Sequence, residues 1–195
     1  MPHVESGMAV GLFGGSFNPP HDGHVLVAET ALRKLGLDQL WWMVTPGNPL
    51  KDRNNLAPLA ERIAMSEKIA RNPRIKVTGF EQALGQSYTA RTLEFVRERN
   101  RGVRFVWVMG ADNLRSFHRW QDWRRIVGTF PIAVIDRPGS TLAYLSSRMA
   151  RTFSRARIDE DDAPTLASRP APAWTFIHGP RSSLSSTALR SAKSG

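Results

Sequence analysis

A short string near the N-terminus combines glycines, prolines and two histidines in a way that suits phosphate chemistry. Residues 14–24 read Gly-Gly-Ser-Phe-Asn-Pro-Pro-His-Asp-Gly-His and lie between an apolar run and a helical pattern. Glycines let the backbone approach a ligand closely, and prolines stiffen the loop. Asp22 is placed to cap the following helix, whose first amide N–H groups form a ready anion site. His21 and His24 would lie near that first turn, where their imidazoles can donate to the oxygens of a phosphate chain.

Other phosphate motifs and a zinc site fit this string less well. The P-loop needs Gly-Lys-Ser/Thr, and the glycine spacing differs from the dinucleotide-binding fingerprint. A zinc ion on His21 and His24 has no evident third ligand, and the helix amides repel cations. We therefore expect an anion site and no metal bound by the protein. The alternative is that the glycines and prolines only shape a turn beside two surface histidines.

A second anion motif stands near the end of the chain. Residues 181–190 read Arg-Ser-Ser-Leu-Ser-Ser-Thr-Ala-Leu-Arg. Ser185 or Ser186 is a natural helix N-cap, with Thr187 in the first turn, so hydroxyls and free amides would combine there. Arg190 would project from the same end and hold phosphate oxygens. A plain serine-capped helix is the alternative interpretation.

Apolar runs and helical patterns alternate along the chain, which predicts an α/β fold. The expected strands are short apolar runs at residues 8–13, 40–44, 75–77, 103–109, 131–135 and 174–177. The expected helices cover residues 25–35, with Gly36 as the C′ residue, then 58–70, 89–99 and a Trp-rich stretch ending at about 128. This alternation implies parallel βαβ units, in which ligands bind beyond the carboxyl ends of the strands. The turns after Phe13, Val44, Met109 and Ile135 are therefore the places where chemistry is expected.

The chain is expected to form one domain over residues 1–195, with two special segments. From 137 to 172 the composition shifts to Ser, Arg, Ala and Pro around an acidic run. This shift predicts a surface insertion with one helix at Thr141–Met149. A C-terminal helix at residues 185–193 is expected to carry the second anion motif.

Composition limits the possible classes of function. The chain has 195 residues, a formal net charge of +10 and no cysteine. Disulfides, thiolate chemistry and Cys-ligated zinc are thus excluded. No apolar run approaches the roughly 20 residues that a bilayer requires, and no secretory signal is visible, so a cytoplasmic protein is expected. The positive charge favours anionic partners such as nucleotides, phosphorylated metabolites or nucleic acid.

The first string resembles the His-x-Gly-His signature of the nucleotidyltransferase superfamily. With its flanks, Gly-Gly-Ser-Phe-Asn-Pro-Pro-His-x-Gly-His, it is similar to the bacterial nicotinate-nucleotide adenylyltransferase family. The second motif is similar to the family's Ile-Ser-Ser-Thr-x-x-Arg, with Leu184 in place of Ile. The resemblance covers roughly residues 8–136 and 174–191. It implies a Rossmann-like, doubly wound parallel sheet.

Further segments resemble the family and imply roles for more residues. They are the Pro-x-x-Asn-Pro-x-Lys loop that ends at Lys51, the Ser-Tyr-Thr segment at residues 87–89, the Gly-x-Asp at residues 110–112, and an aromatic stretch at 117–123. For ATP, the resemblance implies Gly14, Gly15, Ser16, Phe17, His21, Gly23, His24, Gly110, Asp112, Ser185, Ser186, Thr187 and Arg190. For nicotinate mononucleotide, it implies Asn18, Lys51, Ser87, Tyr88, Thr89, Phe117 and Trp120.

Some of these residues also have plain structural interpretations. Lys51 is then a surface lysine, Asp112 a helix cap and Trp123 a core residue. Three tryptophans on expected strands, at positions 41, 42 and 107, are expected in the core rather than in a site.

The implied reaction joins nicotinate mononucleotide to the adenylyl group of ATP, with Mg²⁺ carried on the triphosphate, to give deamido-NAD and pyrophosphate. His24 and His21 are the implied catalytic residues, and no covalent enzyme intermediate is needed. One alternative is a related nucleotidyltransferase that prefers nicotinamide mononucleotide or phosphopantetheine. Another is a basic RNA- or ribosome-binding module on an inactive scaffold, although no RNA-binding motif is visible. The segments 87–92 and 116–121 contain no Asp or Glu, which favours the acid over the amide substrate.

Overall fold

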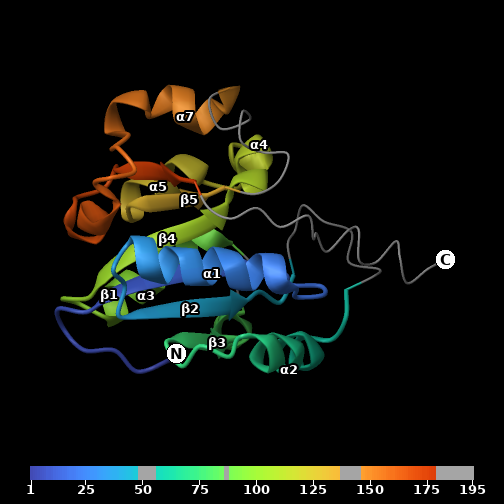
Figure 1. Ribbon diagram of the computed structural model, residues 1–195. Helices are drawn as coiled ribbons and strands as arrows, with labels where there is room; N and C mark the ends of the chain where they lie inside the picture. Colours follow the sequence, from blue (N-terminus) through green and yellow to red (C-terminus); the bar gives the residue numbers. More distant parts are fainter. Residues whose placement is uncertain (48–55, 86–87, 137–145, 179–195) are drawn as a thin grey trace.

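A six-stranded parallel sheet forms the centre of the molecule (Figure 1). The computed structural model describes residues 1–47, 56–85, 88–136 and 146–178. The strands are β1 (Ala9–Gly15), β2 (Gln39–Val44), β3 (Ile75–Thr78), β4 (Arg104–Gly110), β5 (Ile132–Ile135) and β6 (Trp174–Ile177). Their order is β3-β2-β1-β4-β5-β6, and each neighbouring pair is parallel. The expected doubly wound α/β fold is confirmed, because the strand order reverses between β1 and β4.

Helices connect the strands close to the positions that the apolar patterns predict. The α-helices are α1 (Asp22–Lys34), α2 (Leu59–Ile69), α3 (Thr89–Arg99), α4 (Leu114–Phe117), α5 (Trp123–Thr129) and α7 (Arg148–Thr152). The 3-10 helices are η1 (Phe80–Leu84), η2 (Ala111–Asn113), η3 (Ser154–Ala156) and η4 (Ala163–Ser168). The Trp-rich stretch divides into η2, α4 and α5, because Asp122 has a positive φ of 54° that a continuous helix does not accommodate. None of the helices in the described part of the chain has the length and apolar character needed to cross a membrane.

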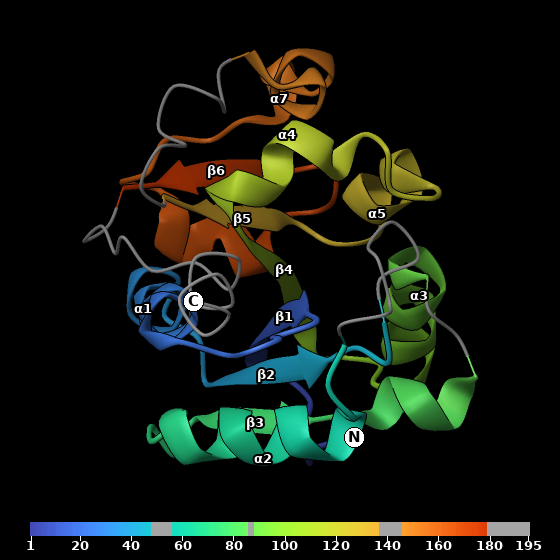
Figure 2. The same ribbon diagram turned by 90° about the vertical axis from the view of Figure 1, so that its right-hand side faces the viewer.

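Side chains alternate between the two faces of the sheet, and helices cover both faces (Figure 2). Leu12 and Trp41 pack with α3, α4, α5 and α7 on one face. Phe13 and Trp42, one residue further along each strand, pack with α1, α2 and η4 on the other. Strands that are buried on both faces read as nearly continuous apolar runs, which is why the sequence identified them.

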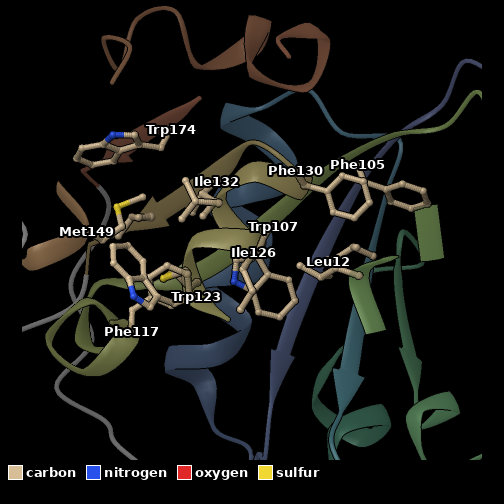
Figure 3. Close-up of a cluster of buried hydrophobic side chains, with 14 of the residues drawn as sticks. Leu12, Phe105, Trp107, Phe117, Trp123, Ile126, Phe130, Ile132, Met149 and Trp174 are labelled. Atoms are coloured by element: carbon tan, nitrogen blue, oxygen red, sulfur yellow. The ribbon is translucent and has the colours of Figure 1, made fainter. Parts of the chain in front are cut away.

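Aromatic side chains fill the core on the face covered by α3 and α5 (Figure 3). Trp107 of β4, Phe117 of α4 and Trp123 of α5 are only 2%, 0% and 7% exposed. The rings of Phe117 and Trp123 meet edge to face, with centroids 6.1 Å apart. Trp41 and Trp42 are fully buried as well. The expectation that the strand tryptophans belong to the core is therefore confirmed.

The segment at residues 146–172 packs against the sheet, which differs from the expected surface insertion. Met149 of α7 and Leu166 of η4 are fully buried and join the cores of opposite faces. The segment is rich in Ser, Arg, Ala and Pro, so its composition did not indicate that a few apolar side chains are buried against the sheet. Only the end of the helix expected at Thr141–Met149 lies among the described residues, and α7 begins there at Arg148.

Strand β1 continues through two glycines that the sequence placed after its end. Gly14 and Gly15 pair with Met43 and Val44 of β2. A Cβ atom on Gly14 would lie 2.6 Å from the Cη2 atom of Trp107, so a larger residue does not fit there. The first phosphate motif therefore begins inside the rigid sheet.

Candidate active site

The turn between β1 and α1 places both histidines at the start of a helix. His21 is the N-cap of α1, and its Nδ1 accepts a hydrogen bond from the Gly23 N–H at 3.1 Å. His24 Nδ1 accepts from the His21 N–H at 3.2 Å, which completes a capping box. The prediction that Asp22 caps the helix is wrong, since the His21 ring occupies that role and Asp22 is the first helical residue. An acidic side chain in this first turn still interacts favourably with the helix dipole.

These two hydrogen bonds determine where each imidazole carries its proton. A backbone N–H can only donate, so each Nδ1 must be the acceptor and the ring proton is on Nε2. The ring centroids of His21 and His24 are 3.8 Å apart, so two positive charges at once would repel each other. The pair thus brings two Nε2–H donors to a helix N-terminus, which suits the oxygens of a phosphate group.

Aromatic rings surround His24. The Phe17 ring meets it edge to face with centroids 4.9 Å apart, and the Trp42 ring lies at 6.0 Å. Phe17 itself is 3% exposed and has a φ of 46°, a left-handed conformation that turns the chain sharply after β1. This apolar wall limits the rotamers of the half-buried His24 and shields part of its ring from water, so its interaction with a charged ligand is stronger than it would be in solvent.

The turns after β2 and β4 lie at the same edge of the sheet as the histidine turn. The pairing of β1 with β4 ends at Phe13 and Val108, and each parallel strand continues for two more residues toward this edge, to Gly15 and Gly110. The Thr45 N–H donates to Gly15 O at 2.9 Å, which joins the turn after β2 to the same place. In doubly wound folds, ligands bind at this point of strand-order reversal.

Three other predicted site residues also lie at this edge. Ser16 is half-buried in the turn after β1. Asn18 follows in the same turn, and its Oδ1 accepts a hydrogen bond from the Ala57 N–H at 3.2 Å. Asp112 lies in η2, directly after β4, and is exposed. An exposed carboxylate at this place is able to accept hydrogen bonds from the hydroxyls of a ribose.

Four residues predicted for the mononucleotide pocket lie at the start of α3 and in or just after α4. Tyr88 is the N-cap residue of α3, is 40% exposed and forms no capping hydrogen bond with its side chain, and Thr89 follows it. Trp120 is half-buried, with its ring 5.3 Å from Phe117 and 6.4 Å from Trp107. Phe117 is fully buried, so it has no free face with which to stack on a ligand here. Its geometry supports a role in packing beneath Trp120.

Six predicted site residues lie outside the described residues. They are Lys51, Ser87, Ser185, Ser186, Thr187 and Arg190.

Two buried charged residues outside the sequence motifs were not predicted. Glu81 of η1 is 4% exposed, and burial raises its pKa to about 7 against the opposing effect of a hydrogen bond with Thr92. Arg62 of α2 is 1% exposed, and its guanidinium donates to the main chain of two turns. Neither residue stands in a recognisable motif, and each occupies an ordinary position in a helical pattern. Only their long-range contacts distinguish them from solvated charges.

A doubly wound sheet with a glycine-rich, histidine-bearing turn at its strand-order reversal defines a nucleotide-binding α/β protein. The cytidylyltransferase-like family matches residues 12–192 of the chain. A probable nicotinate-nucleotide adenylyltransferase of Rhizobium meliloti (strain 1021) is 88% identical over 188 residues, which cover 96% of this chain and 100% of that protein. A relative of the same name from Mesorhizobium japonicum is 71% identical over 195 residues, covering 100% of both chains. The chain therefore belongs to the nicotinate-nucleotide adenylyltransferase family of cytidylyltransferase-like proteins.

Solved structures agree with the fold. The Plasmodium falciparum nicotinic acid mononucleotide adenylyltransferase complexed with NaAD superposes with a TM-score of 0.70 at 18% identity. The match covers 94% of this chain and 83% of that chain. The same enzyme complexed with APC gives a TM-score of 0.67 over the same shares of both chains. At this identity, the likeness concerns the fold.

Proposed function

We propose that this protein transfers the adenylyl group of ATP to nicotinate mononucleotide in NAD biosynthesis, forming deamido-NAD and pyrophosphate. The observation that carries the proposal is the paired-histidine turn at the N-terminus of α1, at the same edge of the sheet as the end of β4 with Gly110 and Asp112. The chain is also 88% identical to a probable nicotinate-nucleotide adenylyltransferase, which supports the choice of this reaction.

The reaction is one displacement at phosphorus. An oxygen of the mononucleotide phosphate, already anionic at neutral pH, bonds to the α-phosphorus of ATP. The bond from that phosphorus to the oxygen bridging to the β-phosphorus breaks, and pyrophosphate leaves with the electron pair. The protein has only to align the two substrates and stabilise the developing charge.

Each side of the site has a part in this scheme. The Nε2–H groups of His21 and His24 donate to the phosphates, with His24 closest to the reacting centre. Asp112 accepts from the ribose hydroxyls of ATP. The glycine-rich turn admits the phosphates by its main chain, through Gly14, Gly15, Ser16, Phe17 and Gly23. The sequence motif at Ser185, Ser186, Thr187 and Arg190, together with Lys51, is proposed to bind phosphate and pyrophosphate oxygens.

ATP is proposed to enter as its Mg²⁺ complex. Among the residues that the structure describes, no group of three or more His, Asp or Glu side chains is placed to hold a metal ion. The donor set here is imidazole and amide N–H, which suits anions rather than a hard cation. The ion is therefore assigned to the triphosphate oxygens and water. Both substrates are small, charged molecules, for which we propose reaction in the cytoplasm and no macromolecular partner.

Selection of the acid over the amide is assigned to the start of α3. The two mononucleotides differ only in a carboxylate or a carboxamide, which have nearly the same shape. A carboxylate only accepts hydrogen bonds, whereas an amide also donates. The side chain of the N-cap residue Tyr88 does not cap the first amides of α3, and these amides are donors at the positive end of a helix dipole beside Thr89. Stacking on Trp120 and polar contact with Asn18 complete the proposed pocket.

The test is pyrophosphate release with each mononucleotide at fixed ATP. We expect kcat/KM for nicotinate mononucleotide to exceed that for nicotinamide mononucleotide by at least about 10²-fold, within the roughly 10⁴–10⁵-fold that unpaired polar groups can give. Equal values, or a preference for the amide, would contradict the pocket assignment. No release with either mononucleotide would overturn the proposed function and favour a binding module.

A further inference from the structure

Arg62 is a buried cation whose acceptors are main-chain oxygens. It lies in the first turns of α2 and is 1% exposed, although arginines are rarely buried without a carboxylate partner. Among the described residues, no carboxylate forms an ion pair with it. Burying a charged guanidinium costs free energy of folding unless its N–H groups form hydrogen bonds. The contacts that supply these hydrogen bonds therefore have a structural purpose.

The guanidinium donates to four carbonyl oxygens, three of them in the turns after β1 and β2 and the fourth at Ala57, just before α2. Nη1 donates to Ser16 O at 2.6 Å and to Thr45 O at 2.8 Å. Nη2 donates to Pro46 O at 3.3 Å, and Nε donates to Ala57 O at 2.8 Å. Ser16 belongs to the turn after β1, and Thr45 and Pro46 belong to the turn after β2. One planar group therefore joins the loops at the ends of two neighbouring strands.

Arg62 is poorly suited to contact a ligand itself. An arginine has five N–H donors, and these four hydrogen bonds leave it at most one. Its 1% exposure leaves almost no surface for a substrate. Burial lowers the pKa of its guanidinium, but an arginine stays charged in proteins. Its effect on the site must pass through the loops that it holds.

The held carbonyls determine where two amide donors point. In a trans peptide, the C=O and the following N–H point in opposite directions. The bonds to Ser16 O and Pro46 O therefore direct the N–H groups of Phe17 and Gly47 away from the guanidinium. Neither of these N–H groups donates to another main-chain group in the described parts of the chain, although both residues are buried. Buried N–H groups of this kind need an acceptor, and a cation on the carbonyl side makes each a stronger donor.

We propose that Arg62 is a positioning residue, which locks the turns after β1 and β2 together and aims the Phe17 and Gly47 amides at the phosphates of the substrates. The ligand class rests on the proposed function. The locking of the turns rests on the hydrogen bonds alone. No acidic or hydroxyl side chain can take over this role, because the acceptors are carbonyl oxygens that require a donor reaching in several directions.

Two substitutions at Arg62 and one control in the same helix test the proposal. Arg62→Lys keeps the charge but has one nitrogen, which cannot span both turns. Arg62→Met keeps most of the apolar stem and removes every donor. Ile63→Ala is the control, because Ile63 packs α2 on the core and makes no hydrogen bond with either turn. All three are compared at temperatures where circular dichroism shows each to be folded.

Both Arg62 variants should lower kcat/KM by about 10–10²-fold per folded molecule, mainly through kcat, because small misplacements of aligned groups are costly to rate. Ile63→Ala should lower Tm but keep kcat/KM within about threefold. Hydrogen exchange without substrate should be about tenfold faster in both Arg62 variants at the Thr45 amide, which donates to Gly15 O, and unchanged in Ile63→Ala.

Arg62 variants that keep wild-type kcat/KM and wild-type exchange would overturn the proposal while leaving the function intact. An Arg62→Lys variant that loses no more activity than Ile63→Ala at the same loss of Tm would overturn it too. Faster exchange in a protein whose wild type releases no pyrophosphate would support the locking role and contradict the proposed function.

Discussion

Each histidine of the first motif uses one ring nitrogen for structure and the other for chemistry. Nδ1 of His21 and Nδ1 of His24 accept main-chain N–H groups at the start of α1, so the helix and the ring orientation depend on each other. Nε2 is then the atom that carries the proton toward a ligand. This division means that loss of a histidine has two separable consequences, one for stability and one for catalysis.

Replacing His24 by two different residues should separate these consequences. His24→Ala and His24→Asn both remove the Nε2–H donor, so both should lower kcat by about 10²–10⁴-fold. Asn retains an acceptor close to the position of Nδ1, so only the alanine variant should also lose about 1 kcal/mol of stability through the capping box. Steady-state kinetics and thermal unfolding measure the two effects.

A surface histidine serves as the control for that comparison. His3 is exposed and remote from α1 in the sequence, so His3→Ala should change neither kcat nor Tm appreciably. Near-wild-type turnover in purified His24→Asn would remove His24 from the mechanism.

At the scale of elements, the junction between η1 and α3 contains a carboxyl group in an apolar setting. Glu81 is 4% exposed, and burial raises its pKa to about 7 from an ordinary value of 4.5. The hydrogen bond with Thr92, in the first turn of α3, acts in the opposite direction and is the smaller effect. The folded protein therefore holds this proton over a pH range in which the unfolded chain releases it.

This difference should make the stability of the protein fall as pH rises. Below about pH 4.5, both states hold the proton and the contribution is fully present. It is lost progressively up to about pH 7, with an upper limit of roughly 3 kcal/mol from the difference in pKa. Glu81→Gln keeps the shape and cannot ionise, so it should unfold at a higher temperature than wild type at pH 8 and at a similar one at pH 4.5.

Thermal unfolding from pH 4.5 to 8 measures the effect, and Glu67→Gln on the exposed side of α2 is the matched control. A pH dependence that is the same in Glu81→Gln as in wild type would show that another group titrates.

The elements themselves were largely predictable, because each strand is buried on both faces and each long helix has one apolar side. Local chemistry also placed the histidine-bearing turn correctly between β1 and α1, and its role as an anion site stays a prediction. The sequence did not indicate that His21 rather than Asp22 caps α1, because both residue types suit the start of a helix. Arg62 and Glu81 could not be found, since their burial follows from contacts with residues distant in the chain. Met149 was missed because a few apolar anchors do not alter the composition of a polar segment.

At the scale of the whole molecule, the charge is strongly positive. The formal net charge is +10, and the ion pairs in the described chain, such as Arg169 with Asp162 at 3.7 Å, neutralise few of the arginines. Both proposed substrates are anions, so a positive field would raise their local concentration. The same field would also attract nucleic acid, which is why the magnitude of the charge does not by itself identify the partner.

Removing positive charges far from the site, and measuring the rate at low and at physiological salt, should show whether the field steers the substrates to the site. The Debye length is about 30 Å at 0.01 M and about 8 Å at 0.15 M ionic strength, so remote charges act only in dilute buffer. Arg97, in the last turn of α3, and Arg101, in the turn that follows, are exposed at the opposite end of that helix from Tyr88. Changing both to Gln lowers the net charge from +10 to +8 without altering the site.

We expect the Arg97→Gln and Arg101→Gln double variant to have kcat/KM for ATP about two- to threefold below wild type at 0.01 M salt and equal to it at 0.15 M, with kcat unchanged at both. Electrostatic steering predicts this result, because a long-range field changes the rate at which ATP reaches the site but not the rate of the displacement at phosphorus. Initial rates at low ATP concentration over a salt series measure it. A change in kcat, or a loss that persists at 0.15 M, would mean that the two arginines act on the site by structure rather than through the field.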